Sequence, residues 1–308
     1  MSGLSDVPFR TIVWSLGAGY VVSEMLSSKP ELWDTEKSRR RRESVPGIWP
    51  VAVQLAGSEA TQLAQSARKH VDEGAQIIDL NFGCPAKKVC NKAAGSALLS
   101  NETLVFEIVS AVVRAVSVPV TVKTRTGPSV EHRNAVRIAK LVEAAGASAL
   151  FLHGRTRACR FTGEAEYVSA RSVKAALSIP VIVNGDITSV AKAREVLKFT
   201  GADGLMIGRG ALGAPWLLSM LNGADEPSLT EKWRIMRRHL SLMHDFYGEY
   251  KGVRIARKHI GAYLTKLGLP QNVKAFNQID DADAQMDQLS FLECRHASIA
   301  GLDVDNAA

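Results

Sequence analysis

The residues of this chain that could best do chemistry lie in the run Asn81-Phe82-Gly83-Cys84-Pro85, directly after an apolar stretch at 76–80. Glycine and proline on either side of the thiol predict a sharply turned, rigid backbone at the end of a buried strand. In parallel α/β proteins, active sites lie at such strand ends. Cys84 is therefore a candidate nucleophile or acid, and a small buried hydrophobic residue is the alternative reading.

Polar or charged residues also end the other apolar, strand-like runs of the chain. In order they are Gln54, Asn81 with Cys84, Lys123 with Arg125, His153 with Arg155, Asn184-Gly185-Asp186 and Gly208-Arg209. Loop hydrogen bonding alone hardly explains a whole ring of such residues, so the pattern predicts an active site at one end of a barrel. Lys123 should face an anion or an electron-rich group, because an unpaired buried ammonium is costly.

The last two of these strand ends indicate a phosphate site. Barrels often bind phosphate there, and Gly185 and Gly208 would let backbone N–H groups approach its oxygens. Arg209 adds charge. We therefore expect a phosphorylated cofactor, although either glycine alone could be an ordinary turn residue. His153 could be a core histidine, but its place beside Arg155 favours a functional role.

The elements that must position these residues alternate along the first two thirds of the chain. Strands are expected at 20–24, 51–55, 77–81, 118–123, 149–153, 179–184 and 204–208, with helices such as 60–73, 102–115, 135–145 and 190–197 between them. Seven such units fit a (β/α)₈ TIM barrel whose first strand is missing, since Met1 opens directly into a loop and helix. A doubly wound open sheet competes, but no Gly-x-Gly-x-x-Gly follows an early strand.

From about residue 225 the alternation stops, and residues 231–247, 253–267 and 281–296 have the pattern of amphipathic helices. We therefore predict two domains. Residues 1–224 form a catalytic barrel, and residues 225–308 form a small helical domain with an acidic tail, joined at a loop over 222–227.

Composition bounds the class of protein. The chain has 308 residues, of which 46% are hydrophobic and 22% charged, which argues against disordered and fibrous proteins. The four cysteines (Cys84, Cys90, Cys159, Cys294) form neither a disulfide framework nor paired C-x-x-C motifs, which predicts a reduced, cytoplasmic protein. Without a long apolar run or a signal peptide, we expect no membrane association, and we expect a monomer.

The charge pattern hints at a polyanionic partner. The net charge is +7, from 38 basic and 31 acidic residues. Basic residues gather at 37–42 and over 234–259, whereas acidic residues gather between 280 and 305. The pattern fits nucleic-acid binding as well as it fits solvated helix faces and a solubilising tail.

Taken together, these motifs resemble the tRNA-dihydrouridine synthases, most closely their bacterial B-type (NifR3-like) branch. In chain order they are Asp6-x-Pro8-Phe9-Arg10, Ser23-Glu24-Met25, Gln54-Leu-Ala-Gly57, Asn81-Phe-Gly-Cys84-Pro85-Ala-Lys87-Lys88, Gly95-Ser-Ala-Leu-Leu99, Lys123-Thr-Arg125-Thr-Gly127, His153-Gly-Arg155-Thr156-Arg157, Asn184-Gly-Asp186-Ile187 and Met206-Ile-Gly208-Arg209. No single motif is decisive, but their order and spacing extend over almost the whole chain.

The resemblance implies an FMN enzyme with a (β/α)₈ barrel and a C-terminal helical domain. Such an enzyme uses NADPH to reduce the C5–C6 double bond of a uridine in the tRNA D-loop, and the branch favours position 17. By this resemblance, FMN N5 delivers hydride to C6 and Cys84 protonates C5. The chemistry is consistent, because a thiol with the ordinary cysteine pKa of about 8.5 is protonated at neutral pH and can donate.

The resemblance also implies the binding residues, and no metal. Those that bind the cofactor are Met1, Ser2, Gln54, Lys123, His153, Asn184, Gly185, Asp186, Gly208 and Arg209. Lys123 would stabilise the anionic reduced flavin. Those that bind the substrate are Asn81, Arg125, Arg155, Phe161, Arg254, Arg257 and Lys258. Phe161 would stack on the flipped uracil, and the basic residues at 39–42 and 254–258 would hold tRNA phosphates.

Family members carry an apolar strand and an Ala-Pro pair before the residue that matches Met1, where this chain begins. We therefore expect weaker FMN binding and lower solubility than in a version with the upstream residues.

Two alternatives stay open. One is an FMN barrel that reduces a free pyrimidine-like small molecule, which would not need a basic helical domain. The other is a cofactor-poor, noncatalytic RNA-binding or regulatory relative. Activity on free uracil or uridine would favour the first, and a colourless protein that binds tRNA would favour the second.

Overall fold

The computed structural model describes residues 3–91 and 93–299, and by its packing the chain divides into two units. Unit 1 comprises residues 1–7 and 19–209, and unit 2 comprises residues 8–18 and 210–308. Whereas the sequence suggests a boundary near residue 224, residues 8–18 and 210–224 group with the C-terminal helices. The assignment of FMN binding to one part and tRNA binding to the other stays a prediction.

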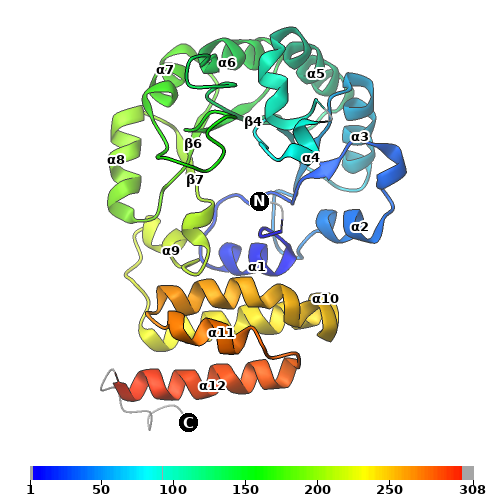
Figure 1. The fold of residues 1–308 in the computed structure, drawn as a ribbon. Coiled ribbons are helices and arrows are strands. Elements are labelled where there is room, and N and C mark those ends of the chain that lie inside the picture. Colours follow the sequence, from blue (N-terminus) through cyan, green and yellow to red (C-terminus); the bar gives the residue numbers. More distant parts are fainter. Residues whose placement is uncertain (1–2, 92, 300–308) are drawn as a thin grey trace. The chain divides into compact units, whose positions relative to one another are not determined.

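Unit 1 is built on a parallel sheet whose strands follow one another in chain order (Figure 1). In the described residues the sheet has seven strands: β1 (Leu26–Ser27), β2 (Ala52–Ala56), β3 (Ile77–Asn81), β4 (Val120–Arg125), β5 (Ala149–His153), β6 (Val181–Asn184) and β7 (Gly204–Met206). Each strand pairs in parallel with the next. This order, with helices between the strands, confirms the predicted TIM-barrel-type α/β fold.

Helices surround the sheet in Figure 1. They are α2 (Glu36–Arg42), α3 (Ala60–Asp72), α4 (Lys87–Cys90), α5 (Glu102–Ala115), α6 (Ala135–Ala144), α7 (Val168–Ala176) and α8 (Val190–Thr200), with 3₁₀ segments at Pro30–Leu32, Gly95–Ser100 and Arg209–Ala211. Helix α5 shows why they pack, because its buried Val105, Ile108, Val109 and Val112 share one face.

The two faces of each strand have different partners, since successive side chains point to opposite sides of a sheet. Leu80, Val122 and Leu152 belong to the apolar core that includes the buried faces of the helices. Their chain neighbours Asn81, Lys123 and His153 lie on the other face. The pattern therefore gathers polar side chains inside the barrel, at the carboxyl ends of the strands.

The predicted strand at residues 20–24 is wrong. Only Val22 makes an isolated bridge to Ala52, and β1 lies further along the chain. Two side chains explain the difference. The Ser23 hydroxyl, rather than a backbone carbonyl, accepts a hydrogen bond from the Gln54 N–H at 3.0 Å. The Tyr20 ring stacks on Phe151, with ring centroids 5.7 Å apart.

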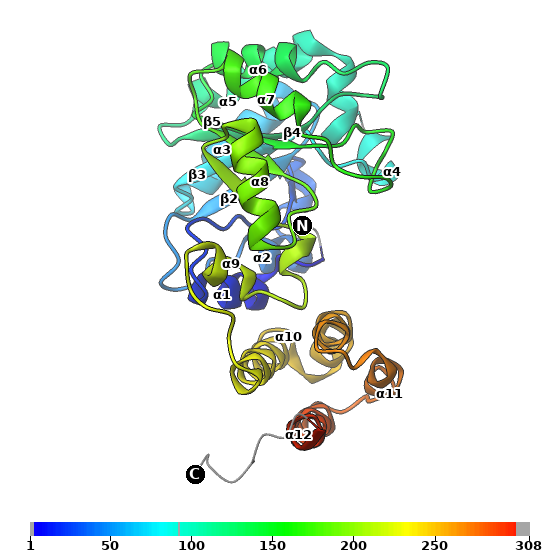
Figure 2. The same cartoon turned by 90° about the vertical axis from the view of Figure 1, so that its left-hand side faces the viewer.

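Unit 2 is helical, and Figure 2 shows two arms of α10 side by side. Its helices are α1 (Val7–Ser15, from Pro8 onward), α9 (Leu217–Leu221), α10 (Leu229–Lys266), α11 (Val273–Phe276) and α12 (Ala282–Ile299), with a 3₁₀ turn at Pro270–Asn272. A Ser228–Glu231 capping box begins α10, and non-helical backbone at Gly248 (φ 73°, ψ 167°) divides it. The separate helices expected on either side are thus confirmed.

No helix in the described ranges is long and apolar enough to cross a membrane.

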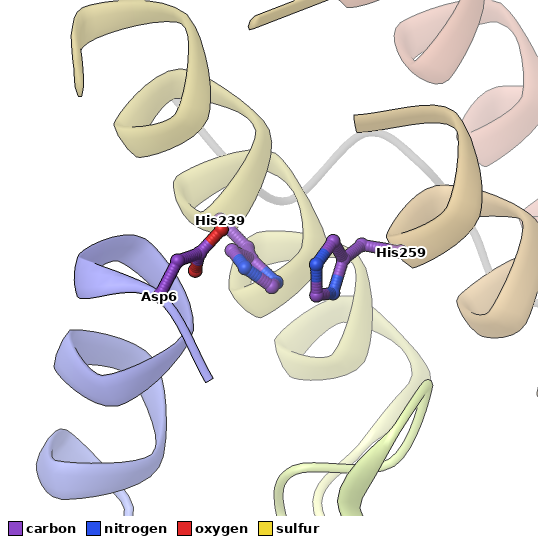
Figure 3. A group of neighbouring side chains, drawn as sticks. All are labelled: Asp6, His239 and His259. Carbon is purple, nitrogen blue, oxygen red and sulfur yellow. The ribbon is translucent and has the colours of Figure 1, made fainter. Parts of the chain in front are cut away.

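Two buried histidines, one from each arm of α10, meet inside unit 2 (Figure 3, which also draws Asp6 of unit 1). The rings of His239 and His259 lie 4.8 Å apart, and both side chains are fully buried. The Phe9 ring lies against both, with its centroid 5.9 Å from that of His239 and 5.8 Å from that of His259. Burial, with a smaller contribution from Lys258, lowers the pKa of His259 to about 3, so the folded protein holds this imidazole neutral.

Acid is therefore expected to destabilise unit 2 through His259. A histidine in the unfolded chain has a pKa near 6.5. On acidification, the His259 side chain is therefore protonated in the unfolded chain well before it is protonated in the folded chain, where its pKa is about 3. The contribution of His259 to the free energy of unfolding is therefore highest above pH 6.5 and falls as the pH drops toward 3. His259→Phe should lower this slope by up to about 1.4 kcal/mol per pH unit. Urea unfolding between pH 4 and 7 measures it, with the exposed His132→Gln as control, and identical slopes for wild type and His259→Phe would contradict the expectation.

Candidate active site

The strand register brings together the polar residues predicted at the strand ends. Asn81 on β3 is the register partner of Lys123 on β4. Arg125 pairs with His153, and His153 pairs with Asn184. Because neighbouring parallel strands lie about 4.8 Å apart, these side chains form one continuous group at the mouth of unit 1.

The backbone of Cys84 is fixed from both sides. The Asn81 side-chain oxygen accepts hydrogen bonds from the N–H groups of Gly83 at 3.2 Å and Cys84 at 2.9 Å. The Cys84 carbonyl accepts from the Ser96 N–H at 3.1 Å and the Ser96 hydroxyl at 2.9 Å. Gly95 (φ +62°) has no Cβ, which would lie only 2.7 Å from that carbonyl. The half-buried free thiol of Cys84 therefore projects from a rigid turn.

A chain of hydrogen bonds connects this turn to the barrel interior. The Asn81 amide donates to the Gln54 oxygen at 2.8 Å, and the Gln54 amide donates to Asp79 at 2.7 Å. The Thr121 hydroxyl donates to the other Asp79 oxygen at 2.6 Å. An ionised carboxylate can only accept, so Asp79 sets the orientation of both amides and, through Asn81, of the Cys84 turn.

Burial raises the pKa of Asp79 to about 6, which predicts a pH-dependent stability. Because the folded-state pKa exceeds the ordinary value of 3.8, the carboxyl contributes stability that is fully present below about pH 4 and is lost as the pH rises through 6. Asp79→Asn cannot titrate. The difference in unfolding free energy between wild type and variant should therefore change by about 2 kcal/mol between pH 4 and pH 7.

Chemical denaturation at several pH values measures this difference. The matched control is Asp72→Asn, which removes an exposed carboxylate from α3. Stability profiles of wild type and Asp79→Asn that stay parallel across this range would contradict the expectation.

Lys123 and His153 set the charge inside the barrel, at the carboxyl ends of the strands. The Lys123 ammonium donates to the Asn184 oxygen at 3.1 Å, and burial, followed by the nearby Arg125 charge, lowers the pKa of Lys123 to about 8. Burial and the neighbouring cations lower the pKa of His153 to about 2, so its ring is neutral. An Arg155 N–H lies 3.4 Å from His153 Nε2, which must accept, so the proton is on Nδ1.

Arg155, Asp186 and Arg209 form an ion-pair group at the ends of β5, β6 and β7. The Arg155 guanidinium is buried and binds both carboxylate oxygens of Asp186, and Arg209 contacts the same carboxylate at 3.3 Å. Burial raises the pKa of Asp186, but hydrogen bonds from Arg155 and the Ala165 N–H outweigh this and hold it below its ordinary value. Asp186 is therefore a carboxylate at neutral pH.

Gly185 is required by packing. Its φ is +124°, and a Cβ there would lie 2.8 Å from the Ala165 Cβ and 3.0 Å from the His153 ring. The absence of a side chain lets the residue that follows β6 pack against the end of β5. A phosphate contact at Gly185 or Gly208 stays a prediction.

Arg125 acts as a clamp between two loops. Its guanidinium donates to the carbonyls of Gly83 at 2.6 Å, Thr156 at 3.0 Å and Arg160 at 2.7 Å, and only 2% of the residue is exposed. These bonds indicate a positioning role, and substrate binding by Arg125 stays a prediction. Phe161 is 55% exposed at the mouth, with the Arg125 and Arg209 guanidinium groups each 5.4 Å from its ring centroid.

Many of the basic residues expected to meet a polyanion have partners within the protein. In α2, Arg40 pairs with Glu36, Arg41 with Glu24, and Arg42 with Asp34 and Glu73. In unit 2, Arg257 pairs with Asp280, and Arg254 lies 3.8 Å from the Tyr250 ring centroid and 3.9 Å from the Asp280 carboxylate. Substrate binding by Arg254, Arg257 and Lys258 stays a prediction.

Comparisons with known proteins identify the family of this chain. The sequence model of the family described as dihydrouridine synthase (Dus) matches residues 1–300 of the chain. The chain belongs to the dihydrouridine synthase family. The chain is 53% identical over 293 residues to tRNA-dihydrouridine synthase B of Pseudomonas syringae pv. tomato, covering 92% of this chain and 87% of the relative. It is 52% identical over 297 residues to tRNA-dihydrouridine synthase B of Proteus vulgaris, covering 94% and 92%.

A solved structure, histamine dehydrogenase from Rhizobium sp. 4-9, also resembles this chain in fold. The TM-score is 0.53 at 13% identity, over 78% of this chain and 46% of that chain. A likeness at this identity concerns the fold alone, and it agrees with the barrel-type sheet of unit 1.

Some residues that hold this candidate site together had no role in the sequence analysis. Asp79, Thr121 and Ser96 received no role, although they anchor the Cys84 turn. A signal for Asp79 was present, because it lies two residues before Asn81 on a strand and so shares its face. Ser96 gave no such signal, since only the loop path brings it to Cys84. The predicted contacts of Met1 and Ser2 lie outside the described residues.

Proposed function

We propose that this protein is a flavin-dependent tRNA-dihydrouridine synthase, which reduces the C5–C6 double bond of a D-loop uridine, at position 17, with NADPH. Membership of the family and the function named for its relatives support the reaction and the substrate. The observation that carries the proposal is the thiol of Cys84, held on a fixed turn at the same strand ends as Lys123 and His153.

The residues at the mouth fit FMN. The Lys123 ammonium donates one hydrogen bond to Asn184. Its pKa is lowered because burial removes it from water and the Arg125 charge lies nearby. An electron-rich ring would satisfy it. The Gln54 amide has a second hydrogen, and the half-exposed Arg209 side chain can meet a phosphate. FMN, when bound, would supply the hydride for uracil C6.

In the proposed reaction the chain's own residues supply the proton and the positioning. The Cys84 thiol protonates uracil C5, and its rigid turn sets where that proton is delivered. A uracil can reach this thiol only after it leaves its stack. The exposed ring of Phe161 is suited to stack on the flipped base, and the second amide hydrogen of Asn81 is suited to contact it.

The helical unit would hold the rest of the tRNA. Arg254, Arg257 and Lys258 lie on the second arm of α10 and would contact phosphates.

Incubation of the purified protein with an unmodified tRNA transcript and NADPH tests the proposal. The expected results are a yellow protein, one dihydrouridine per tRNA by mass spectrometry, and its mapping to position 17. Reduction of free uridine without reduction of tRNA would support a small-molecule reductase instead. A colourless protein that binds tRNA without modifying it would support the noncatalytic alternative, and NADH in place of NADPH tests the reductant.

A further inference from the structure

A basic groove lies directly beside the Cys84 turn. It is a cavity of about 390 Å³ lined by Pro85, Lys87, Cys90, Asn91, Arg157, Ala158 and Arg160. Three of these seven residues are cationic and none is acidic. Among the described residues, none of the three cationic side chains has a carboxylate partner, in contrast to the paired arginines of α2. Such a groove is complementary to an anion.

The groove has rigid walls. One wall is the 157–160 turn, in which Arg160 has a left-handed backbone (φ 51°) that is uncommon for a residue with a side chain. The buried Arg125 holds this turn through the Arg160 carbonyl at 2.7 Å. A non-glycine residue keeps such a conformation where its surroundings enforce it, and this occurs often at binding sites.

The other wall belongs to the segment that carries the thiol. Pro85 follows Cys84 in the chain, and the Cys90 Sγ lies 3.4 Å from the Cys84 carbonyl. Arg125 also donates to the Gly83 carbonyl at 2.6 Å. One buried guanidinium thus fixes both walls relative to the thiol, and an anion in the groove would lie at a set place beside the reacting base.

We propose that this groove binds backbone phosphates of the substrate RNA next to the uridine presented to Cys84. The inference rests on the proposed function, because it takes the base at Cys84 to belong to a nucleic-acid strand. A flipped nucleotide draws its neighbouring phosphates toward the pocket that receives it. Lys87, Arg157 and Arg160 supply the charge that these phosphates need, and two exposed side chains among them make the groove accessible.

Charge-neutralising variants test the proposal. They are Lys87→Gln, Arg157→Gln and Arg160→Asn, singly and together, and asparagine suits the left-handed backbone at position 160. The control is Arg194→Gln, which removes an exposed arginine of α8 that has no carboxylate partner in the described part of the chain. The measurements are the Kd for unmodified tRNA over a range of KCl concentrations, the kcat at saturating tRNA and the KM for NADPH.

The triple variant should raise the Kd on the order of 10²-fold at about 0.1 M salt and should lower the slope of log K against log salt by about 2. The kcat at saturating tRNA should stay within a few-fold of wild type. A Kd and slope equal to those of the control would overturn the proposal. So would a raised KM for NADPH with unchanged tRNA binding, which would assign the groove to the phosphates of the reductant.

The test separates this proposal from the proposed function. If the wild type binds tRNA but forms no dihydrouridine, the reaction is wrong, and the binding data still decide whether the groove holds phosphates. If the wild type is active and the triple variant binds and reacts like the control, the groove proposal alone fails.

Discussion

Cys84→Ala is expected to lower dihydrouridine formation by about 10²- to 10⁴-fold, the usual contribution of a positioned general acid. Alanine keeps the backbone hydrogen bonds that Asn81 and Ser96 make to this residue, so the turn should persist without its proton donor. The expected defect lies in kcat, with flavin content and tRNA affinity close to those of wild type. Single-turnover reduction of tRNA by the photoreduced or NADPH-reduced protein measures the step directly.

Two further variants make this test specific. Cys294→Ala removes an exposed thiol from unit 2 and should leave the rate unchanged. Cys84→Ser keeps a hydroxyl of much weaker acidity, so its rate should stay well below that of wild type. Full activity in Cys84→Ala would remove this residue from the proposed mechanism, whereas loss of flavin in that variant would indicate a structural role.

Arg125→Leu is expected to lower the free energy of unfolding by about 3 kcal/mol, because the buried carbonyls of Gly83 and Thr156 and the partly buried hydrogen bond to the Arg160 carbonyl would each lose their donor. Burial lowers the pKa of Arg125 to about 10, so the guanidinium still carries its charge at neutral pH. Activity should fall with stability, since the Cys84 turn and the 157–160 turn would lose their common anchor. Denaturant unfolding followed by tryptophan fluorescence measures the change.

Arg125→Lys separates charge from geometry. Lysine keeps the positive charge but lacks the planar fork that spans three acceptors, so this variant should also be destabilised. Arg114→Leu, at an exposed position near the end of α5, is the matched control and should change stability by less than about 0.5 kcal/mol. Wild-type stability in both Arg125 variants would show that the clamp contributes little to folding.

The strands of the barrel were predictable because they leave a local signal. Buried parallel strands are short apolar runs, and the expected and observed bounds of β3 and β5 coincide at 77–81 and 149–153. The C-terminal helices also leave a local signal, so both they and the break at Gly248 were predictable. Residues 20–24 were misjudged because their β-branched run predicts a strand, whereas the Ser23 hydroxyl and the Tyr20 ring engage β2 and β5 instead.

The partners of the site residues could not be predicted, because they come from distant parts of the chain. The sequence did not show that the Arg125 guanidinium binds the carbonyls of residues 83, 156 and 160. The arginines at 40–42 formed a basic run in the sequence, yet each has a carboxylate partner. The groove beside the Cys84 turn combines Arg157 and Arg160, which are three residues apart, with Lys87 from a distant segment, so the sequence did not show that the three line one cavity.

The sequence by itself determined the alternating barrel fold, the helical C-terminal part and the set of polar strand ends with Cys84 among them. These features follow from local patterns, since strand periodicity and the parallel connection rule bring all strand ends to one edge. Only the tertiary structure decided how the thiol is held, through Asp79, Gln54, Asn81 and Ser96, and which cations stay unpaired. Strand register and loop paths set those contacts, and both depend on the packing of the whole unit.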